Sequence, residues 1–175
     1  MDCEDFHSVL EVLKPDELQR LTVLEIINAR GSLDLFKVSN AFPKLESLEI
    51  YYSTSVHVSF KENFQFSNLK KLIIYDTELS GAASETILAG CPKIVTLTLA
   101  HCEEVTDEIF GQILEKNPLK DCRELSILFA PQLSSDTLRY IITCLDKYDF
   151  YVYLNVPRNI GLSLVLINAI FDKQN

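Results

Sequence analysis

Apolar residues recur along this chain in a six-residue pattern, apolar-x-x-apolar-x-apolar, that occurs six times. The copies are LTVLEI from Leu21, LESLEI from Leu45, LKKLII from Leu69, IVTLTL from Ile94, LSILFA from Leu125 and YVYLNV from Tyr151. Their starts lie 24, 24, 25, 31 and 26 residues apart. Because alternate residues of a strand face the same side, each copy predicts a short strand with its apolar members pointing inward. The near-constant spacing predicts an internal repeat with one strand in each unit.

The segments between the strands predict how the chain returns to begin the next unit. DEIFGQILEKN (107–117) and DTLRYIITCLDKY (136–148) place apolar residues at helical spacing. Asp107 and Asp136 stand at the starts of these helices, where a carboxylate can accept free backbone N–H groups. YYSTSVHVSFKENFQF (51–66) alternates instead, so an extended or irregular segment is expected there. The fold class predicted is α/β: a curved solenoid with a parallel inner sheet, and with helices and irregular segments on its convex side.

The same pattern divides the chain into a stack and two ends. Residues 1–20 are predicted to form an N-terminal helical cap, with Pro15 in a first helical turn and with Ser8 and Glu11 at capping-box spacing. Residues 21–159 hold about six units, starting near 21, 45, 69, 94, 125 and 151. Residues 160–175 are predicted to form a C-terminal cap, because the last unit of a solenoid must be covered at its outer end.

One unit carries the clearest sequence signature. In CPKIVTLTLAHCEEVTD (91–107), cysteines, the strand leucines and a closing Val-Thr-Asp stand at fixed places, namely Cys91, Pro92, Ile94, Leu97, Leu99, Cys102, Val105, Thr106 and Asp107. This unit resembles the cysteine-containing subclass of the leucine-rich repeat family. The resemblance implies that the ninth residue of each unit points inward and bonds the backbone of the adjacent turn. Those residues are Ala29, Ser53, Thr77, Cys102, Leu133 and Asn159.

The resemblance also implies a function. Proteins with this unit are often F-box proteins, the substrate receptors of Skp–cullin ubiquitin ligases, and VLKPDELQRL (12–21) resembles segments associated with an F-box. The implied function is therefore a non-catalytic module that binds a partner protein through its concave face, as a substrate-recognition adaptor with Skp and cullin components as further partners. A structural or inhibitory subunit held permanently in one complex is the alternative.

The chemical groups of the same unit do not predict catalysis. Cys91 and Cys102 are eleven residues apart, which is not the spacing of paired zinc ligands. His101 and Cys102 are neighbours on a strand and should face opposite sides, so they cannot form a Cys–His nucleophile. No phosphate-binding glycine motif or esterase motif occurs. We therefore expect no enzyme activity, no metal and no cofactor.

Composition narrows the class of partner. The chain has 175 residues and a net charge of −9, which disfavours nucleic acid. Its longest apolar run near the end, IGLSLVLINAIF (160–171), is shorter than a membrane span. Five cysteines without paired spacing favour a reducing, intracellular location, cytoplasmic or nuclear. The chain by itself is expected to be monomeric.

The outward positions of the strands predict where a partner binds. Counting from each unit start, the fifth place reads Glu25, Glu49, Ile73, Thr98, Phe129 and Asn155, and the seventh reads Ile27, Tyr51, Tyr75, Ala100, Pro131 and Pro157. The eighth place adds Tyr52 and His101. Exposed aromatic residues with aliphatic neighbours are typical of binding hot spots. The predicted partner-binding residues are Tyr51, Tyr52, Tyr75, Ile73, Glu49, His101 and Phe129. The alternative, that the tyrosines only cover the sheet, stays open.

Overall fold

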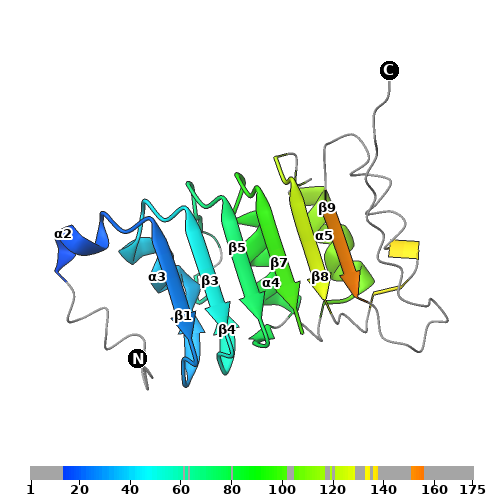
Figure 1. The fold of residues 1–175 in the computed structure, drawn as a ribbon, viewed down its shortest axis with the longest axis horizontal. Helices are drawn as coiled ribbons and strands as arrows, with labels where there is room; N and C mark the ends of the chain where they lie inside the picture. Colours follow the sequence, from blue (N-terminus) through cyan, green and yellow to red (C-terminus); the bar gives the residue numbers. More distant parts are fainter. Residues whose placement is uncertain are drawn as a thin grey trace.

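A stack of parallel strands forms the front of the molecule. The computed structural model describes residues 14–60, 62, 64–79, 81–101, 105–116, 119, 121–128, 133–134, 136–137 and 151–155. The strands are β1 (Val23–Ile27), β3 (Ser47–Tyr51), β5 (Lys71–Tyr75), β7 (Thr96–Ala100), β8 (Glu124–Leu128) and β9 (Tyr151–Asn155). All neighbouring pairs are parallel, and their order in the sheet is their order in the chain (Figure 1).

The strand alternation buries the residues that the sequence predicts. Leu48 and Ile50 of β3 and Leu72 and Ile74 of β5 are fully buried, as are the equivalent residues of β7. They belong to one continuous hydrophobic core that runs from Ile26 to Leu133. Each inward leucine or isoleucine contributes about 1.5–3 kcal/mol by leaving water, so the alternation fixes which side of the sheet is the core.

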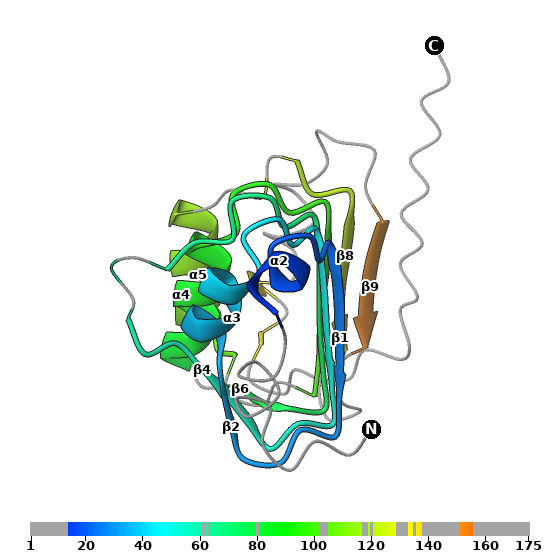
Figure 2. The same ribbon diagram turned by 90° about the vertical axis from the view of Figure 1, so that its left-hand side faces the viewer.

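A second layer of short strands and helices lies behind the large sheet. A smaller parallel sheet consists of β2 (Ser32–Asp34), β4 (Ser55–His57) and β6 (Glu78–Leu79). The helices α3 (Leu35–Ala41), α4 (Gly81–Ala89) and α5 (Asp107–Lys116) lie opposite the large sheet, and Figure 2 shows the large sheet, the small sheet and the helices end-on as three sides of the stack. The α/β solenoid is therefore confirmed, and so are the extended segment after β3 and the helix that begins at Asp107. The sequence patterns did not single out α3 and α4.

The strand register corrects the predicted start of the fifth unit. Thr98 pairs with Ser126, and Ser126 pairs with Tyr153, so neither Phe129 nor Asn155 lies in the column of Glu49 and Ile73. The turn before the strand agrees, because the Cys122 N–H donates to the Leu119 carbonyl as the Leu45 and Leu69 N–H groups donate to the carbonyls of Phe42 and Phe66. Cys122 therefore takes the place of Leu45, three residues before the predicted start at Leu125. The pattern matched Leu125, Leu128 and Ala130, and so put Phe129 at the fifth place, because Cys122, the true first position, was not counted as a repeat leucine.

The ends of the stack are described in part. A short helix, α2 (Pro15–Leu18), lies over the first turn, with Pro15 at its start as predicted (Figures 1 and 2). Leu18, Leu21 and Leu24 pack against the core from this end. The predicted helix at 136–148 is described only at Asp136 and Thr137, and the predicted cap at 160–175 lies outside the described residues.

Candidate functional site

Among the residues that the structure describes, no helix covers one face of the large sheet, which we call the open face. In Figure 2 it is the side of β1 and β8 that points away from α3, α4 and α5. Strand alternation places Glu25 and Ile27 of β1, Glu49 and Tyr51 of β3, and Ile73 and Tyr75 of β5 on it, in registered rows. The structure thus brings together Tyr51, Tyr75, Ile73 and Glu49 from the predicted set, while Phe129 lies outside the described residues.

Four aromatic rings form one contiguous patch at the carboxyl ends of these strands. The ring centroids of Tyr52 and Tyr75 are 5.5 Å apart in an edge-on contact, and those of Tyr51 and Tyr75 are 6.3 Å apart. Tyr51 and Tyr52 are separated by 6.5 Å, and His101 contacts Tyr75 at 5.5 Å. We call Tyr51, Tyr52, Tyr75 and His101 the tyrosine patch. Aromatic contacts of this geometry stabilise one another by about 0.5–1.5 kcal/mol each, so the rings hold fixed positions.

Two members of the patch sit in an unusual backbone conformation. The residue that follows each of β1, β3, β5 and β7 has a positive φ, namely Asn28 (55°), Tyr52 (53°), Asp76 (48°) and His101 (57°). Their N–H groups each donate to the carbonyl at the end of the next strand, which imposes this turn in these four units. Asn and Asp tolerate the left-handed region, whereas a bulky residue there is an outlier with a cost of about 1–2 kcal/mol. Backbone strain at an aromatic residue is a pointer to function.

The Tyr51 hydroxyl is already engaged inside the chain. It donates to Oε2 of Glu49 at 2.7 Å, and the other oxygen of this carboxylate accepts from Nζ of Lys71 at 2.7 Å. The hydrogen bond to Glu49, followed by burial and the charges of Glu49 and Glu25, raises the pKa of Tyr51 to about 12. The pairing with Lys71, followed by the bond from Tyr51, lowers the pKa of Glu49. Tyr51 therefore offers its ring rather than its hydroxyl to a partner.

The described side chains of the open face differ in how far they are exposed. Val23 and Ile27 of β1 are 58% and 46% exposed, and Tyr52 is 54% exposed. Tyr51, Ile73 and Tyr75 are half-buried, whereas Ala100 of β7 is fully buried and Ser126 of β8 nearly so. The most exposed large apolar side chains of the described open face therefore lie on β1 and directly after β3. Val23 was missed because the third place of each unit was not tabulated, although its outward position follows from the same alternation.

The described cysteine side chains, which could serve as nucleophiles or metal ligands, lie in structural positions. Cys91 and Cys122 are free, buried thiols; burial raises the pKa of both, that of Cys122 to about 12. Thiolates are the reactive form, so neither described cysteine is suited to catalysis. Within the described part of the chain no three His, Cys, Asp or Glu side chains are grouped so that they could hold a metal ion.

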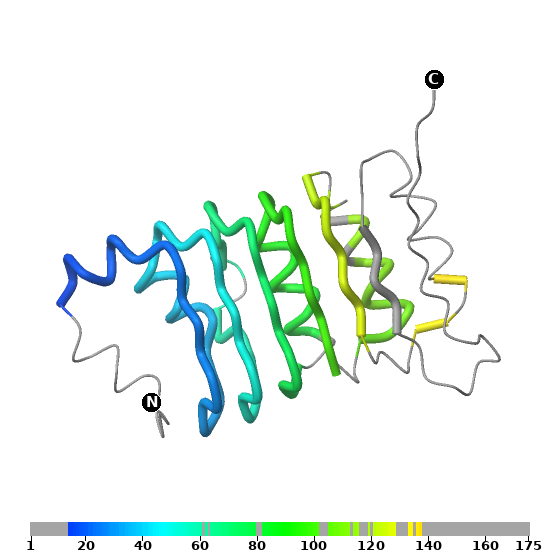
Figure 3. The backbone as a smooth tube through the Cα atoms, viewed as in Figure 1, coloured from blue at the N-terminus to red at the C-terminus, as the bar shows by residue number. Residues whose placement is uncertain are grey.

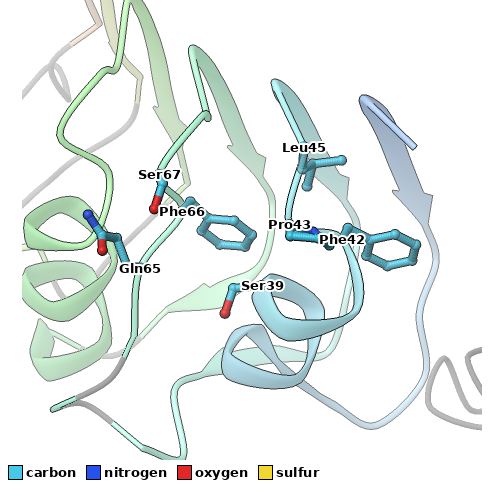
Figure 4. A pocket seen from close by; sticks show the side chains of 7 residues that line it. All are labelled: Ser39, Phe42, Pro43, Leu45, Gln65, Phe66 and Ser67. Atoms are coloured by element: carbon cyan, nitrogen blue, oxygen red, sulfur yellow. The ribbon is translucent and has the colours of Figure 1, made fainter. Parts of the chain in front are cut away.

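A small pocket opens between the first turns of the stack. It has a volume of about 90 Å³ and lies between the end of α3 and the segment before β5 (Figure 4). Its lining is formed by Ser39, Phe42, Pro43, Leu45, Gln65, Phe66 and Ser67. Sites for small molecules are usually about 300–1,000 Å³, so this pocket is too small for a cofactor.

None of the described helices is long and apolar enough to cross a lipid bilayer.

Comparison with known proteins gives one match. Residues 6–146 match the family model described as "FBD-associated F-box protein At5g56370, LRR repeats". No curated protein and no solved structure gives a significant match to the chain. The matched range spans β1 to β8 and therefore includes the whole tyrosine patch.

Proposed function

Because this chain belongs to the family of leucine-rich repeats of FBD-associated F-box proteins, we propose that it binds a partner protein through the open face of its large sheet. The observation that carries the proposal is the tyrosine patch, in which four rings are in contact and Tyr52 is 54% exposed. Tyrosines that are large, rigid and partly exposed are the residues that most often dominate binding energy at interfaces.

The patch is also prepared for binding before a partner arrives. Ring contacts and the bond from Tyr51 to Glu49 restrict the side chains, so less conformational entropy is lost on association. Val23, Ile27 and Ile73 extend the patch with apolar surface across the neighbouring strands. This combination of aromatic anchors, apolar neighbours and charged residues fits recognition by surface complementarity rather than chemistry.

The finer role we propose is substrate recognition for a Skp–cullin ubiquitin ligase. The family supports this role because its members are repeats of F-box proteins. In such an adaptor the open face would hold the substrate, while the ligase components would be recruited elsewhere. The second role, a permanent subunit of one complex, would use the same face for a single partner.

Tyr52→Asn is the sharpest test of the proposed face. Asn already occupies the equivalent position 28, so this change relieves the strained backbone while removing an exposed ring. The gain offsets the lost ring contacts, and the free energy of unfolding should stay within about 1 kcal/mol of the wild type. Capture of the partner from native cells by the intact chain should fall about 30-fold, as for a hot-spot residue.

Phe60→Asn provides a matched control. Phe60 is 62% exposed and contacts Phe36 of α3 at 4.9 Å, so it belongs to the side of the molecule that carries the helices. Its replacement should leave partner capture unchanged. Equal capture by wild type and Tyr52→Asn would contradict the proposal. Recovery of Skp and cullin with the partner supports the adaptor, whereas one stoichiometric partner without them supports the permanent subunit.

A further inference from the structure

The lysines on and beside the open face are already paired with acids of the same chain. Nζ of Lys71 lies 2.7 Å from Oε1 of Glu49, and Nζ of Lys70 lies 2.9 Å from Oε2 of Glu46. Neither Glu25 nor Asp76 forms an ion pair with any residue that the structure describes. Both of these residues are exposed. Once the internal pairs are counted, the charge left around the tyrosine patch is negative.

The two unpaired carboxylates lie on strands or turns next to the rings. Glu25 is the register neighbour of Glu49 on β1, close enough to Tyr51 for its charge to help raise the pKa of that hydroxyl. Asp76 directly follows Tyr75 in the sequence. In the row of positive-φ residues it is the neighbour of Tyr52 on the adjacent strand end. Neighbouring strands are about 4.8 Å apart, so an Asp76 carboxylate lies within reach of a group placed on the Tyr52 ring.

The ring faces and hydroxyls complete a site for a cation. The face of a tyrosine ring is electronegative and attracts a positive charge held within about 6 Å of its centre. Tyr52 is more than half exposed, and its hydroxyl and that of Tyr75 make no hydrogen bond with the described part of the chain. A planar guanidinium can stack on a ring and bond a carboxylate through two N–H groups at once, which an ammonium cannot do.

We propose that the open face recognises a basic segment of its partner, with an arginine side chain stacked on the exposed ring of Tyr52, beside Tyr75, and its guanidinium paired with Asp76. This inference rests on the proposed function, because it names the chemistry of the partner at the same face. It accounts for an exposed tyrosine in a strained turn, whose neighbour in the next unit is an aspartate without an ion pair in the described part of the chain. Ile27 and Ile73 then contact apolar residues that flank the arginine.

A random twelve-residue peptide library displayed on phage provides the test. Peptides are selected on the intact chain and counter-selected on Tyr52→Asn, so that only ligands of the tyrosine patch remain. The affinity of each ligand is then measured for the wild type, Asp76→Asn and Glu115→Gln. Glu115 is exposed on α5, so Glu115→Gln removes the same charge at a distance from the open face and controls for general attraction of basic peptides to a chain of net charge −9.

The expected result is strong enrichment of arginine in the selected peptides. Asp76→Asn should weaken their binding about 5- to 30-fold, the range for a charge-assisted bond at a partly exposed site, and Glu115→Gln less than about twofold. Tyrosine-dependent peptides without arginine enrichment, or equal losses in the two charge variants, would overturn the inference and leave the proposed function standing. Failure to select any tyrosine-dependent peptide would count against both.

Discussion

At the scale of the residue, Asp34 joins two turns of the solenoid with one side chain. Its Oδ1 accepts the Phe36 N–H at 3.1 Å, which caps α3, and the Ser59 N–H of the next turn at 3.1 Å. Asp107 repeats the second contact by accepting the Ser134 N–H at 2.8 Å, while Oγ1 of Thr106 takes the capping position of α5. The expected helix start at Asp107 is correct, but its carboxylate serves the neighbouring turn rather than its own helix.

The charge of Asp34 should make stability depend on pH. Burial alone would raise the pKa of Asp34, but the bonds from Ser59 and Phe36 outweigh it and lower the pKa below the usual 3.8. A lowered folded-state pKa stabilises the fold at every pH above the unfolded value, and this contribution is lost as pH falls from there through the folded value. Urea unfolding measured from about pH 7 to about pH 2.5 should therefore show a steeper loss in the wild type than in Asp34→Asn.

The comparison at Asp34 has a matched control. Asn keeps an oxygen that can accept both N–H groups, so Asp34→Asn removes the charge with little change in shape. Asp76→Asn makes the same replacement at an exposed position. This variant controls for the loss of one carboxylate outside the joint between turns. If both variants flatten the curve equally, the dependence does not come from the buried joint between turns.

At the scale of the element, the turns after successive strands are joined by an inward polar ladder that is only partly built. Ser53 and Thr77 occupy the same position in consecutive units and are both buried. Oγ1 of Thr77 accepts the Ser53 N–H at 3.3 Å and donates to the Tyr75 carbonyl at 3.1 Å. This is the contact that the family resemblance implies for the ninth place. The Ser53 hydroxyl, in contrast, has no hydrogen-bond partner among the residues that the structure describes.

Equivalent positions should therefore respond in opposite ways to loss of the hydroxyl. Thr77→Val keeps the shape but leaves the buried Ser53 N–H without an acceptor, and should reduce the free energy of unfolding by about 1–3 kcal/mol. Ser53→Ala removes a buried, unpartnered hydroxyl and should leave stability unchanged or raise it by up to about 1 kcal/mol. Urea denaturation of both variants measures the difference.

Thr98→Val serves as the control for the threonine change. Thr98 lies on β7 and faces the open side, half-buried. A β-branched apolar residue is well suited to a strand, so this replacement should change stability by less than about 0.5 kcal/mol. A loss in Thr98→Val as large as in Thr77→Val would show that threonine is needed for the strands in general rather than for the ladder between turns.

At the scale of the whole molecule, one continuous core crosses all the turns. Figure 3 shows the chain coiling through successive turns from β1 to β8, and buried residues from Ile26 to Leu133 form a single cluster. In a repeat protein each unit is stabilised mainly by its neighbours, and a shared core makes the units unfold together. Cys91 and Cys122 lie in two consecutive units of this stack and are both buried.

The two cysteines should report whether the units open together. Buried thiols with raised pKa values react slowly with alkylating reagents, and labelling requires opening of the surrounding core. With site-resolved mass spectrometry in increasing urea, Cys91 and Cys122 should become labelled at the same midpoint. Labelling of Cys122 at clearly lower urea than Cys91 would show instead that the later units open independently of the earlier ones.

Much of this architecture could be predicted from spacing alone, because a leucine or isoleucine at alternate places must be buried wherever a strand forms. Leu48, Ile50, Leu72 and Ile74 behave in this way, and the opposite alternation correctly places Tyr51 and Tyr75 on the other face. The pattern failed where a buried repeat position holds a residue that the pattern does not count as apolar, as at Cys122. A shift of three residues there misassigned Phe129, because register is fixed by hydrogen bonding between strands and not by apolar matches.

The sequence by itself determined the solenoid, the inward rows and the outward position of the tyrosines, since these follow from local periodicity and the cost of exposing apolar side chains. Tertiary structure decided which outward residues meet. Contact between Tyr52 and Tyr75, the strained turn at Tyr52 and the pairing of Glu49 with Lys71 depend on the register and spacing of separate strands. Those quantities are set by hydrogen bonds between residues about 24 positions apart, and such long-range pairing leaves no local trace in the chain.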